Sequence, residues 1–180
     1  AGQTAVVIGA GCIGLVTMMA LKAMGVSKVY VVDIMEKRLE KALELGATGV
    51  INGSKKNAVE AIMELTNGNG CDLIIETAGT EITTIQAIKM AKKGSNIVLV
   101  GYSKTGEMTL PMSLVLDKEL TFKTVFRYRH IYPMAIEAVE NGVVNLKGIV
   151  TNEFALDDIQ NAMDFSVNNK ADIVKAVVRI

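Results

Sequence analysis

Residues 4–33 read TAVVIGAGCIGLVTMMALKAMGVSKVYVVD, and this stretch decides the fold. Its first five residues form a short apolar run that is typical of a buried strand. A turn with glycine at positions 9, 11 and 14 follows, and then an apolar segment of helical period that Gly25 ends. Residues 29–32 form a second apolar run that leads into Asp33. The stretch therefore predicts a strand, a glycine turn, a helix and a second strand that ends on an acid.

The three glycines of this turn have separate physical roles. Gly9 permits a tight turn that a side chain would obstruct. Gly11 lets the backbone approach a pyrophosphate, and Gly14 lets the helix pack closely on the strands. The free N–H groups and the dipole of the helix start favour the phosphate charge. Asp33, 19 positions after Gly14, can accept hydrogen bonds from an adenosine ribose, so the pattern predicts a dinucleotide site.

Other interpretations of the same stretch stay open. A methyltransferase also places an acid after its second strand, and a glycine-rich turn can be purely structural, although the three-glycine spacing favours a dinucleotide. Asp33 with Glu36 also fits a capping box for the next helix. A carboxylate at position 33 would repel a 2′-phosphate, and Ile34 rather than an arginine follows it, so we expect NAD rather than NADP. Arg38 either contacts the adenosine or is an ordinary exposed helix residue.

Composition excludes several classes of partner. The 180 residues carry 19 Lys and Arg against 19 Asp and Glu, and zero net charge argues against nucleic acid or an anionic membrane as the main partner. Hydrophobic residues make up 50%, as in a globular chain, whereas aromatic residues at 4% leave few platforms for stacking on sugars or single-stranded RNA.

The cysteines and the ends of the chain predict a cytoplasmic fragment. Cys12 and Cys71 are too few for a disulfide framework and are expected to be reduced. No signal peptide and no apolar run of membrane length is evident, so we expect a cytoplasmic protein. The chain lacks an initiator Met and opens just before its first strand, which suggests a piece of a longer protein.

Strands alternate with helices along the first hundred residues. We expect helices at 34–45, 57–65 and 81–92, and strands at 50–51, 72–76, 96–100 and 120–126. This alternation predicts an α/β Rossmann fold, a doubly wound parallel six-stranded sheet with helices on both faces, plus a C-terminal extension. Residues 108–110 are expected to form an edge segment, 133–140 and 156–167 helices, and 148–154 and 173–180 extended chain.

Two further turns are expected to join the glycine turn. Ligands bind beyond the carboxyl ends of parallel strands, so the turn Thr77-Ala78-Gly79 and the pair Gly101-Tyr102 should converge on the same crevice. The alternative is ordinary loop chemistry. The single histidine, His130, is more typical of a surface or helix-start residue than of a catalyst, and no metal-binding or nucleophile motif is present.

Several segments together resemble the zinc-dependent medium-chain alcohol dehydrogenases. The glycine turn, Asp33 with Arg38, and the segment ALELGA at 42–47 carry this likeness, with Cys12 where members often have proline. Residues 125–128 (VFRY) and the pair Tyr132-Pro133 are similar to the polyol branch, the sorbitol and xylitol dehydrogenases. The segments LKGIVT at 146–151 and FALD at 154–157 are similar to the same branch.

The resemblance implies a two-domain enzyme of which this chain is one part. Residues 1–147 would form the dinucleotide-binding domain, and 148–180 would pack on a catalytic domain that is absent here and binds the zinc. The implied reaction oxidises a secondary alcohol of a polyol to a ketose by hydride transfer to NAD. We expect no catalytic residue in this chain, with Arg127 either contacting substrate hydroxyls or forming a salt bridge. Arg129 and His130 depart from the usual residues of the branch, which leaves the substrate open.

The alternative functions are a threonine or butanediol dehydrogenase of the same family and a non-catalytic NAD-sensing module. A homo-oligomer is expected through the edge segment 108–110. The residues predicted to contact the cofactor are Gly9, Gly11, Cys12, Ile13, Gly14, Asp33, Arg38, Thr77, Ala78, Gly79, Val100, Gly101, Tyr102, Val125, Phe126 and Arg127.

Overall fold

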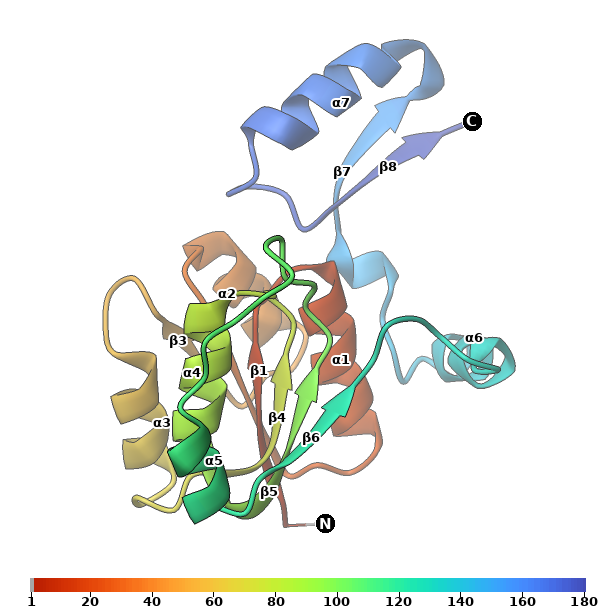
Figure 1. Ribbon diagram of the computed structural model, residues 1–180. Helices are drawn as coiled ribbons and strands as arrows, with labels where there is room; N and C mark the ends of the chain where they lie inside the picture. Colours follow the sequence, from red (N-terminus) through yellow and green to blue (C-terminus); the bar gives the residue numbers. More distant parts are fainter. Residues whose placement is uncertain (1) are drawn as a thin grey trace.

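A parallel sheet of six strands forms the centre of the molecule (Figure 1). The computed structural model describes residues 2–180. The strands are β1 (Thr4–Ile8), β2 (Lys28–Asp33), β3 (Gly49–Asn52), β4 (Cys71–Glu76), β5 (Ala91–Leu99) and β6 (Thr121–Thr124). They lie in the order β3-β2-β1-β4-β5-β6, and every neighbouring pair is parallel. This order confirms the predicted Rossmann fold. From β1 the chain builds the sheet first towards β3 and then, from β4, towards β6, and such folds bind ligands at the point between β1 and β4 where the order changes.

Helices cover both faces of this sheet. Successive strand residues point to opposite faces, and both faces are apolar, so each needs a layer of helices over it. These helices are α1 (Cys12–Ala23), α2 (Glu36–Glu44), α3 (Ala58–Leu65), α4 (Glu81–Met90) and α5 (Met112–Asp117). The helix α6 (Tyr132–Glu140) follows β6 and has no buried residue; it lies to the side of the sheet (Figure 1). Val7 packs in the core that contains α1 and α2, whereas its neighbour Val6 packs in the core that contains α3 and α4. Within residues 2–180, no helix is both long and apolar enough to cross a membrane.

The junction of α4 and β5 differs from the sequence prediction. The helix ends at Met90 rather than at residue 92, and β5 begins at once because Ala91 pairs with Cys71 of β4. The Lys118 ammonium donates to the carbonyl oxygens of Ile88 (3.2 Å), Lys89 (2.8 Å) and Ala91 (2.8 Å). A distant lysine therefore satisfies the carbonyl groups that the helix end leaves unpaired.

The prediction of an edge segment at residues 108–110 is wrong. The Thr109 N–H donates to Glu81 Oε2 at 2.7 Å, and the Thr84 hydroxyl lies 3.4 Å from Met108 Sδ. These contacts hold the segment against α4, so its backbone does not extend the sheet. The sheet ends instead at β6, which is shorter than predicted and leaves residues 125–126 beyond the strand.

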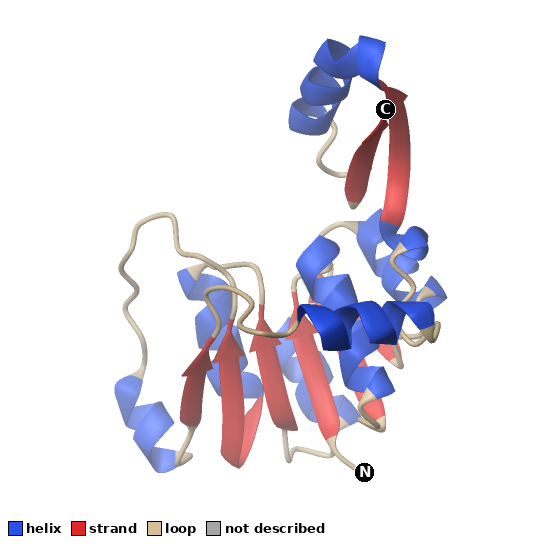
Figure 2. Cartoon of the chain, turned by 90° about the vertical axis from the view of Figure 1, so that its right-hand side faces the viewer, coloured by secondary structure: helices blue, strands red, loops and turns tan. Residues whose placement is uncertain are grey.

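Residues 147–180 form a small C-terminal unit, as expected for a C-terminal extension (Figure 2). Its elements are the 3-10 turns η1 (Lys147–Ile149) and η2 (Leu156–Asp158), the strands β7 (Val150–Ala155) and β8 (Lys175–Arg179), and the helix α7 (Ile159–Asn168). The two strands pair in parallel and are joined by the Glu153–Arg179 ion pair. Ile149, just past the predicted boundary at 147, is only 4% exposed and belongs to the core of α1 and α2.

Candidate dinucleotide site

The glycine turn after β1 holds the start of α1 against the end of the strand. Gly9 has a φ of +103°, a conformation that side chains disfavour. A Cβ atom on Gly14 would lie 1.8 Å from the carbonyl oxygen of Gly9, so only glycine allows this approach. A Cβ on Gly11 would meet nothing within 4 Å, which leaves open space above the turn.

The start of α1 offers backbone amides without competition from side chains. Gly11 is its N-cap, and no side chain caps the helix. The Asn57 side chain caps α3 and Thr80 caps α4, whereas α2 and the later helices, like α1, have no side-chain cap. The first turn of α1 contains no acid, and Ile13 within it is 57% exposed. This helix end therefore fits an anionic group that approaches over Gly11.

Thr77 locks the glycine turn to the next strand of the sheet. Its hydroxyl donates to the carbonyl oxygen of Ile8 at 2.9 Å, and it lies 3.3 Å from that of Gly9. A Cβ on Gly9 would come within 2.5 Å of this hydroxyl. Since Thr77 follows β4, the contact joins the two strands between which the sheet order reverses.

Asp33 joins the end of β2 to the same turn. Its Oδ2 accepts the Ala10 N–H at 2.6 Å, and its Oδ1 accepts those of Ile34 (2.7 Å) and Met35 (2.9 Å). The capping box with Glu36 is not formed, because Met35 is the N-cap of α2 and Glu36 bonds to Asn52 instead. Three of the roughly four acceptor positions of the Asp33 carboxylate are used, which leaves one for a ligand hydroxyl.

Glu76 holds the turn after β4, and the sequence prediction did not single it out. Its carboxylate is 1% exposed and accepts N–H groups from Ala78 (2.8 Å) and Gly79 (2.9 Å) and the Thr83 hydroxyl (2.8 Å). These donors compensate for the cost of burying a charge. The signal in the sequence was an acid at the last position of a buried strand, directly before the turn Thr77-Ala78-Gly79.

The turn after β4 contacts the turn after β5. A Cβ on Gly101 would lie 2.1 Å from the Gly79 nitrogen, and one on Gly79 would lie 2.5 Å from the Tyr102 carbonyl oxygen. The amides of Val100 and Gly101 both donate to the Glu76 carbonyl oxygen. The structure thus brings the three predicted turns together at the carboxyl edge of the sheet.

An exposed aromatic pair continues this edge to β6. Tyr102 and Phe126 are 81% and 77% exposed, and their ring centres lie 6.4 Å apart. The Arg127 guanidinium lies over the Phe126 ring, 5.0 Å from its centre. Within residues 2–180, Arg127 forms no salt bridge, which was the alternative role expected for it. Val125 still donates its N–H to the Leu99 carbonyl oxygen at 2.9 Å, which fixes where this segment leaves the sheet.

Arg38 contacts the C-terminal unit. Its Nη2 donates to the carbonyl oxygens of Lys170 (2.7 Å) and Ile173 (3.4 Å), and Lys37 beside it pairs with Asp172. A cavity of about 210 Å³ lies between this part of α2 and residues 171–174. The predicted contact of Arg38 with adenosine stays a prediction.

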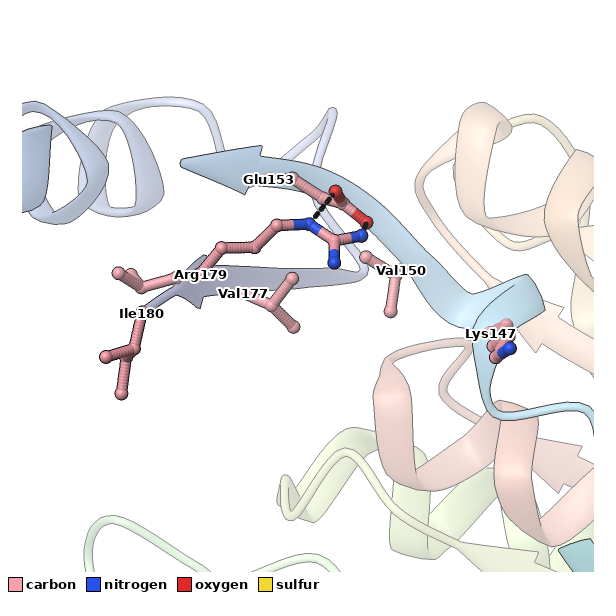
Figure 3. A pocket seen from close by; sticks show the side chains of 7 residues that line it. Lys147, Val150, Glu153, Val177, Arg179 and Ile180 are labelled. Atoms are coloured by element: carbon pink, nitrogen blue, oxygen red, sulfur yellow. Dashed lines mark hydrogen bonds and ion pairs between the residues drawn. The ribbon is translucent and has the colours of Figure 1, made fainter. Parts of the chain in front are cut away.

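The larger cavities lie away from the glycine turn. One of about 650 Å³ lies on the face of β7 and β8, where Figure 3 shows Glu153 and Arg179 bridging the strands. Another, of about 770 Å³, lies between residues 53–60 and α4. Among the described residues 2–180, no group of three or more His, Cys, Asp or Glu side chains is placed to hold a metal ion.

Comparison with known proteins gives one consistent family. The profile of the zinc-binding dehydrogenases matches residues 12–141. An uncharacterized zinc-type alcohol dehydrogenase-like protein of Escherichia coli K12, YdjJ, is 41% identical over 179 residues, which is 99% of this chain and 51% of that protein. The sorbitol dehydrogenase of Bacillus subtilis is 33% identical over 177 residues, or 98% of this chain and 50% of the relative.

Solved structures agree with this similarity. An E. coli oxidoreductase of unknown specificity matches 100% of this chain and 51% of its own with a TM-score of 0.95 at 40% identity. An E. coli CFT073 alcohol dehydrogenase in complex with NADH matches 99% of this chain and 52% of its own with a TM-score of 0.91 at 27% identity. The chain spans about half the length of the curated relatives it matches. It therefore belongs to the zinc-binding medium-chain dehydrogenase family and corresponds to the half built on the Rossmann fold.

Proposed function

We propose that this chain is the coenzyme-binding half of an NAD- and zinc-dependent enzyme that oxidises a secondary alcohol of a polyol to a ketose. The observation that carries this proposal is the uncapped start of α1, held against β1 and β4 by Gly9, Gly14 and Thr77. Such a helix end with open space above Gly11 favours a pyrophosphate.

Each end of the dinucleotide has a candidate set of contacts. The remaining acceptor position of Asp33 suits a ribose hydroxyl, and its negative charge disfavours a 2′-phosphate. The exposed rings of Tyr102 and Phe126, further along the sheet edge, suit the nicotinamide end. Cys12, Ile13, Thr77, Ala78, Val100 and Val125 line the turns between these ends.

Zinc chemistry belongs to the rest of the enzyme in this proposal, because residues 2–180 bring no metal-ligand cluster together. When NAD is bound, it supplies the hydride acceptor. The residues of this chain bind and orient it, and Arg127 donates to a substrate hydroxyl next to the nicotinamide.

The C-terminal unit supports a two-domain arrangement. A two-stranded sheet is marginal by itself, and parallel strands are normally covered on both faces. We propose that residues 148–180 complete the catalytic half of the enzyme, with the open face of β7 and β8 (Figure 3) covered there. We also propose that the enzyme is cytoplasmic and forms a homo-oligomer, for which β6 offers a free edge of the sheet.

A titration of the coenzyme tests the cofactor proposal. Calorimetry of this chain with NAD⁺ and NADP⁺ should give binding of NAD⁺ at least about tenfold tighter. Asp33→Asn should narrow that preference, because it removes the charge that repels the 2′-phosphate. The exposed Asp157→Asn is the matched control and should leave the preference unchanged. A preference for NADP⁺ or binding of neither coenzyme would contradict the proposal.

The substrate class requires the enzyme that contains both halves. Initial rates with a set of pentitols and hexitols should exceed those with threonine and 2,3-butanediol. Higher rates with threonine or 2,3-butanediol would instead indicate a threonine or butanediol dehydrogenase of the same family. Coenzyme binding without turnover of any alcohol would favour the sensing module.

A further inference from the structure

The segment that follows β6 is cationic without compensation. Residues 120–136 contain Lys123, Arg127 and Arg129 but no Asp or Glu, in a chain whose overall charge is zero. Arg127 and Arg129 are exposed, and within residues 2–180 neither forms an ion pair. Both guanidinium groups are therefore accessible to an anionic partner.

The position of these cations is fixed by the fold. The Arg127 guanidinium is held over the Phe126 ring, which lies beside Tyr102 at the end of β5. His130 adopts a left-handed φ of +51°, which non-glycine residues rarely do, and this turn leads into α6. Arg129 therefore lies between an anchored guanidinium and a constrained turn, both at the carboxyl edge of the sheet.

Within residues 2–180, neither Glu107 in the loop after β5 nor Glu137 on α6 forms an ion pair with Arg127 or Arg129. Asp33 and Glu76 each already accept three hydrogen bonds from the turns that they hold. Glu119, the acid just before β6, lies at the opposite end of that strand, about 13 Å away for four residues of extended chain.

The coenzyme phosphates are also too distant to serve as the counter-ion. They are expected at the start of α1, beyond β1, whereas Arg127 follows β6. β6 lies three strands from β1, which is about 14 Å at the usual strand spacing. In the proposed function, oxidised nicotinamide would add a further positive charge near Tyr102 and Phe126.

We infer that the substrate is a polyol with an anionic terminus, a carboxylate or a phosphate, which Arg129 binds while Arg127 contacts the hydroxyls. This inference rests on the proposed function and narrows its substrate class. The reaction stays a simple oxidation: the carbinol carbon gives a hydride to NAD⁺ and the hydroxyl loses a proton to water. The products are the ketone, NADH and H⁺, and the anionic terminus is unchanged.

Matched substrates test the inference on the enzyme that contains both halves. A pentitol, the aldonate of the same configuration and the corresponding pentitol phosphate are compared by kcat/KM. At least one anionic compound should exceed the neutral pentitol about tenfold or more, and which one does identifies the terminus. Neutral pentitol as the best substrate would overturn the inference and leave the proposed function intact. No oxidation of any of the three, or of the wider polyol set, would refute the proposed function itself.

Variants of Arg129 give the second measurement. Arg129→Gln should lower kcat/KM for the anionic substrate by about ten- to hundredfold, mainly through KM, and change the neutral polyol little. Arg129→Lys keeps the charge and should retain most of the preference. Lys93→Gln, which removes an exposed cation near the start of β5, is the matched control. Equal losses for neutral and anionic substrates in Arg129→Gln would show a structural role and overturn the inference.

Discussion

Gly14 of helix α1 lies so close to Gly9 that an added Cβ atom would be 1.8 Å from the Gly9 carbonyl oxygen. Two glycines five positions apart thus set the angle at which the helix leaves the strand. The contact is between backbone groups, which cannot move aside as a flexible side chain can.

Gly14→Ala should therefore destabilise the fold as well as the site. We expect a loss of at least about 2 kcal/mol in the free energy of unfolding, or roughly 4–8 °C in Tm for a chain of this size. Gly11→Ala is the matched comparison, since its Cβ would enter open space. It should leave Tm nearly unchanged but weaken coenzyme binding, because its methyl group occupies the phosphate approach. Thermal unfolding and calorimetry measure both effects, and equal Tm values for the two variants would contradict the argument.

Glu76→Gln should loosen the turn after β4. An amide oxygen at the position of Oε1 would keep the Ala78, Gly79 and Thr83 donors, but those bonds lose the charge that strengthens them. The NH₂ group at the Oε2 position would face the Gly79 N–H, which Oε2 now accepts at 3.1 Å. Hydrogen bonds to charged groups contribute about 1.5–3 kcal/mol, and we expect a loss in that range by urea unfolding. The exposed Glu64→Gln should change stability by less than about 0.5 kcal/mol. If both variants unfold at the same urea concentration, the Glu76 network has no stabilising role.

Asp72 links stability to pH at the other end of the sheet. Its carboxylate accepts the Thr4 N–H at 2.9 Å and the Lys92 ammonium at 3.1 Å, and these contacts, with the backbone bond largest, hold its pKa below the usual value of 3.8. A depressed pKa in the folded state means that the unfolded state binds the proton more readily. The stabilisation is therefore present above pH 3.8 and is lost as the pH falls through the lower folded value.

Asp72→Asn measures this contribution directly. The variant should be less stable than the wild type at pH 7, and the two unfolding curves should converge as the pH falls below about 4. Urea midpoints at several pH values provide the measurement. A difference that persists unchanged at pH 2–3 would exclude the carboxylate charge as its source.

The two cysteines should differ sharply in reactivity. Cys71 is fully buried, and this burial raises the pKa of its thiol to about 12, so almost no thiolate exists at pH 8. Cys12 in the first turn of α1 is only partly buried. Alkylation of the native chain at pH 8 should therefore label Cys12 alone, and denaturation should expose both. Mass spectrometry of tryptic peptides locates the label, and rapid native labelling of Cys71 would contradict its burial.

Local sequence determined the architecture of this protein. The alternation of apolar runs with helical periods predicted the six parallel strands, since period 2 and period 3.6 depend on neighbouring residues alone. The glycine spacing predicted a helix start beside β1, because the left-handed φ of Gly9 and the close approach at Gly14 are demands that only glycine meets. The departures occurred at element ends, such as α4, where Lys118 from a later segment decides the boundary.

Tertiary structure alone decided which partners the functional side chains have. Asp33 bonds to Ala10, 23 positions earlier, and Thr77 bonds to Ile8 across 69 positions. Arg38 bonds to Ile173 across 135 positions. Such pairs depend on strand order and on where the C-terminal unit docks, and no local period encodes either. Glu76 was missed, and the segment 108–110 was predicted wrongly, because their hydrogen-bond partners become neighbours only after the sheet and helix α4 have packed.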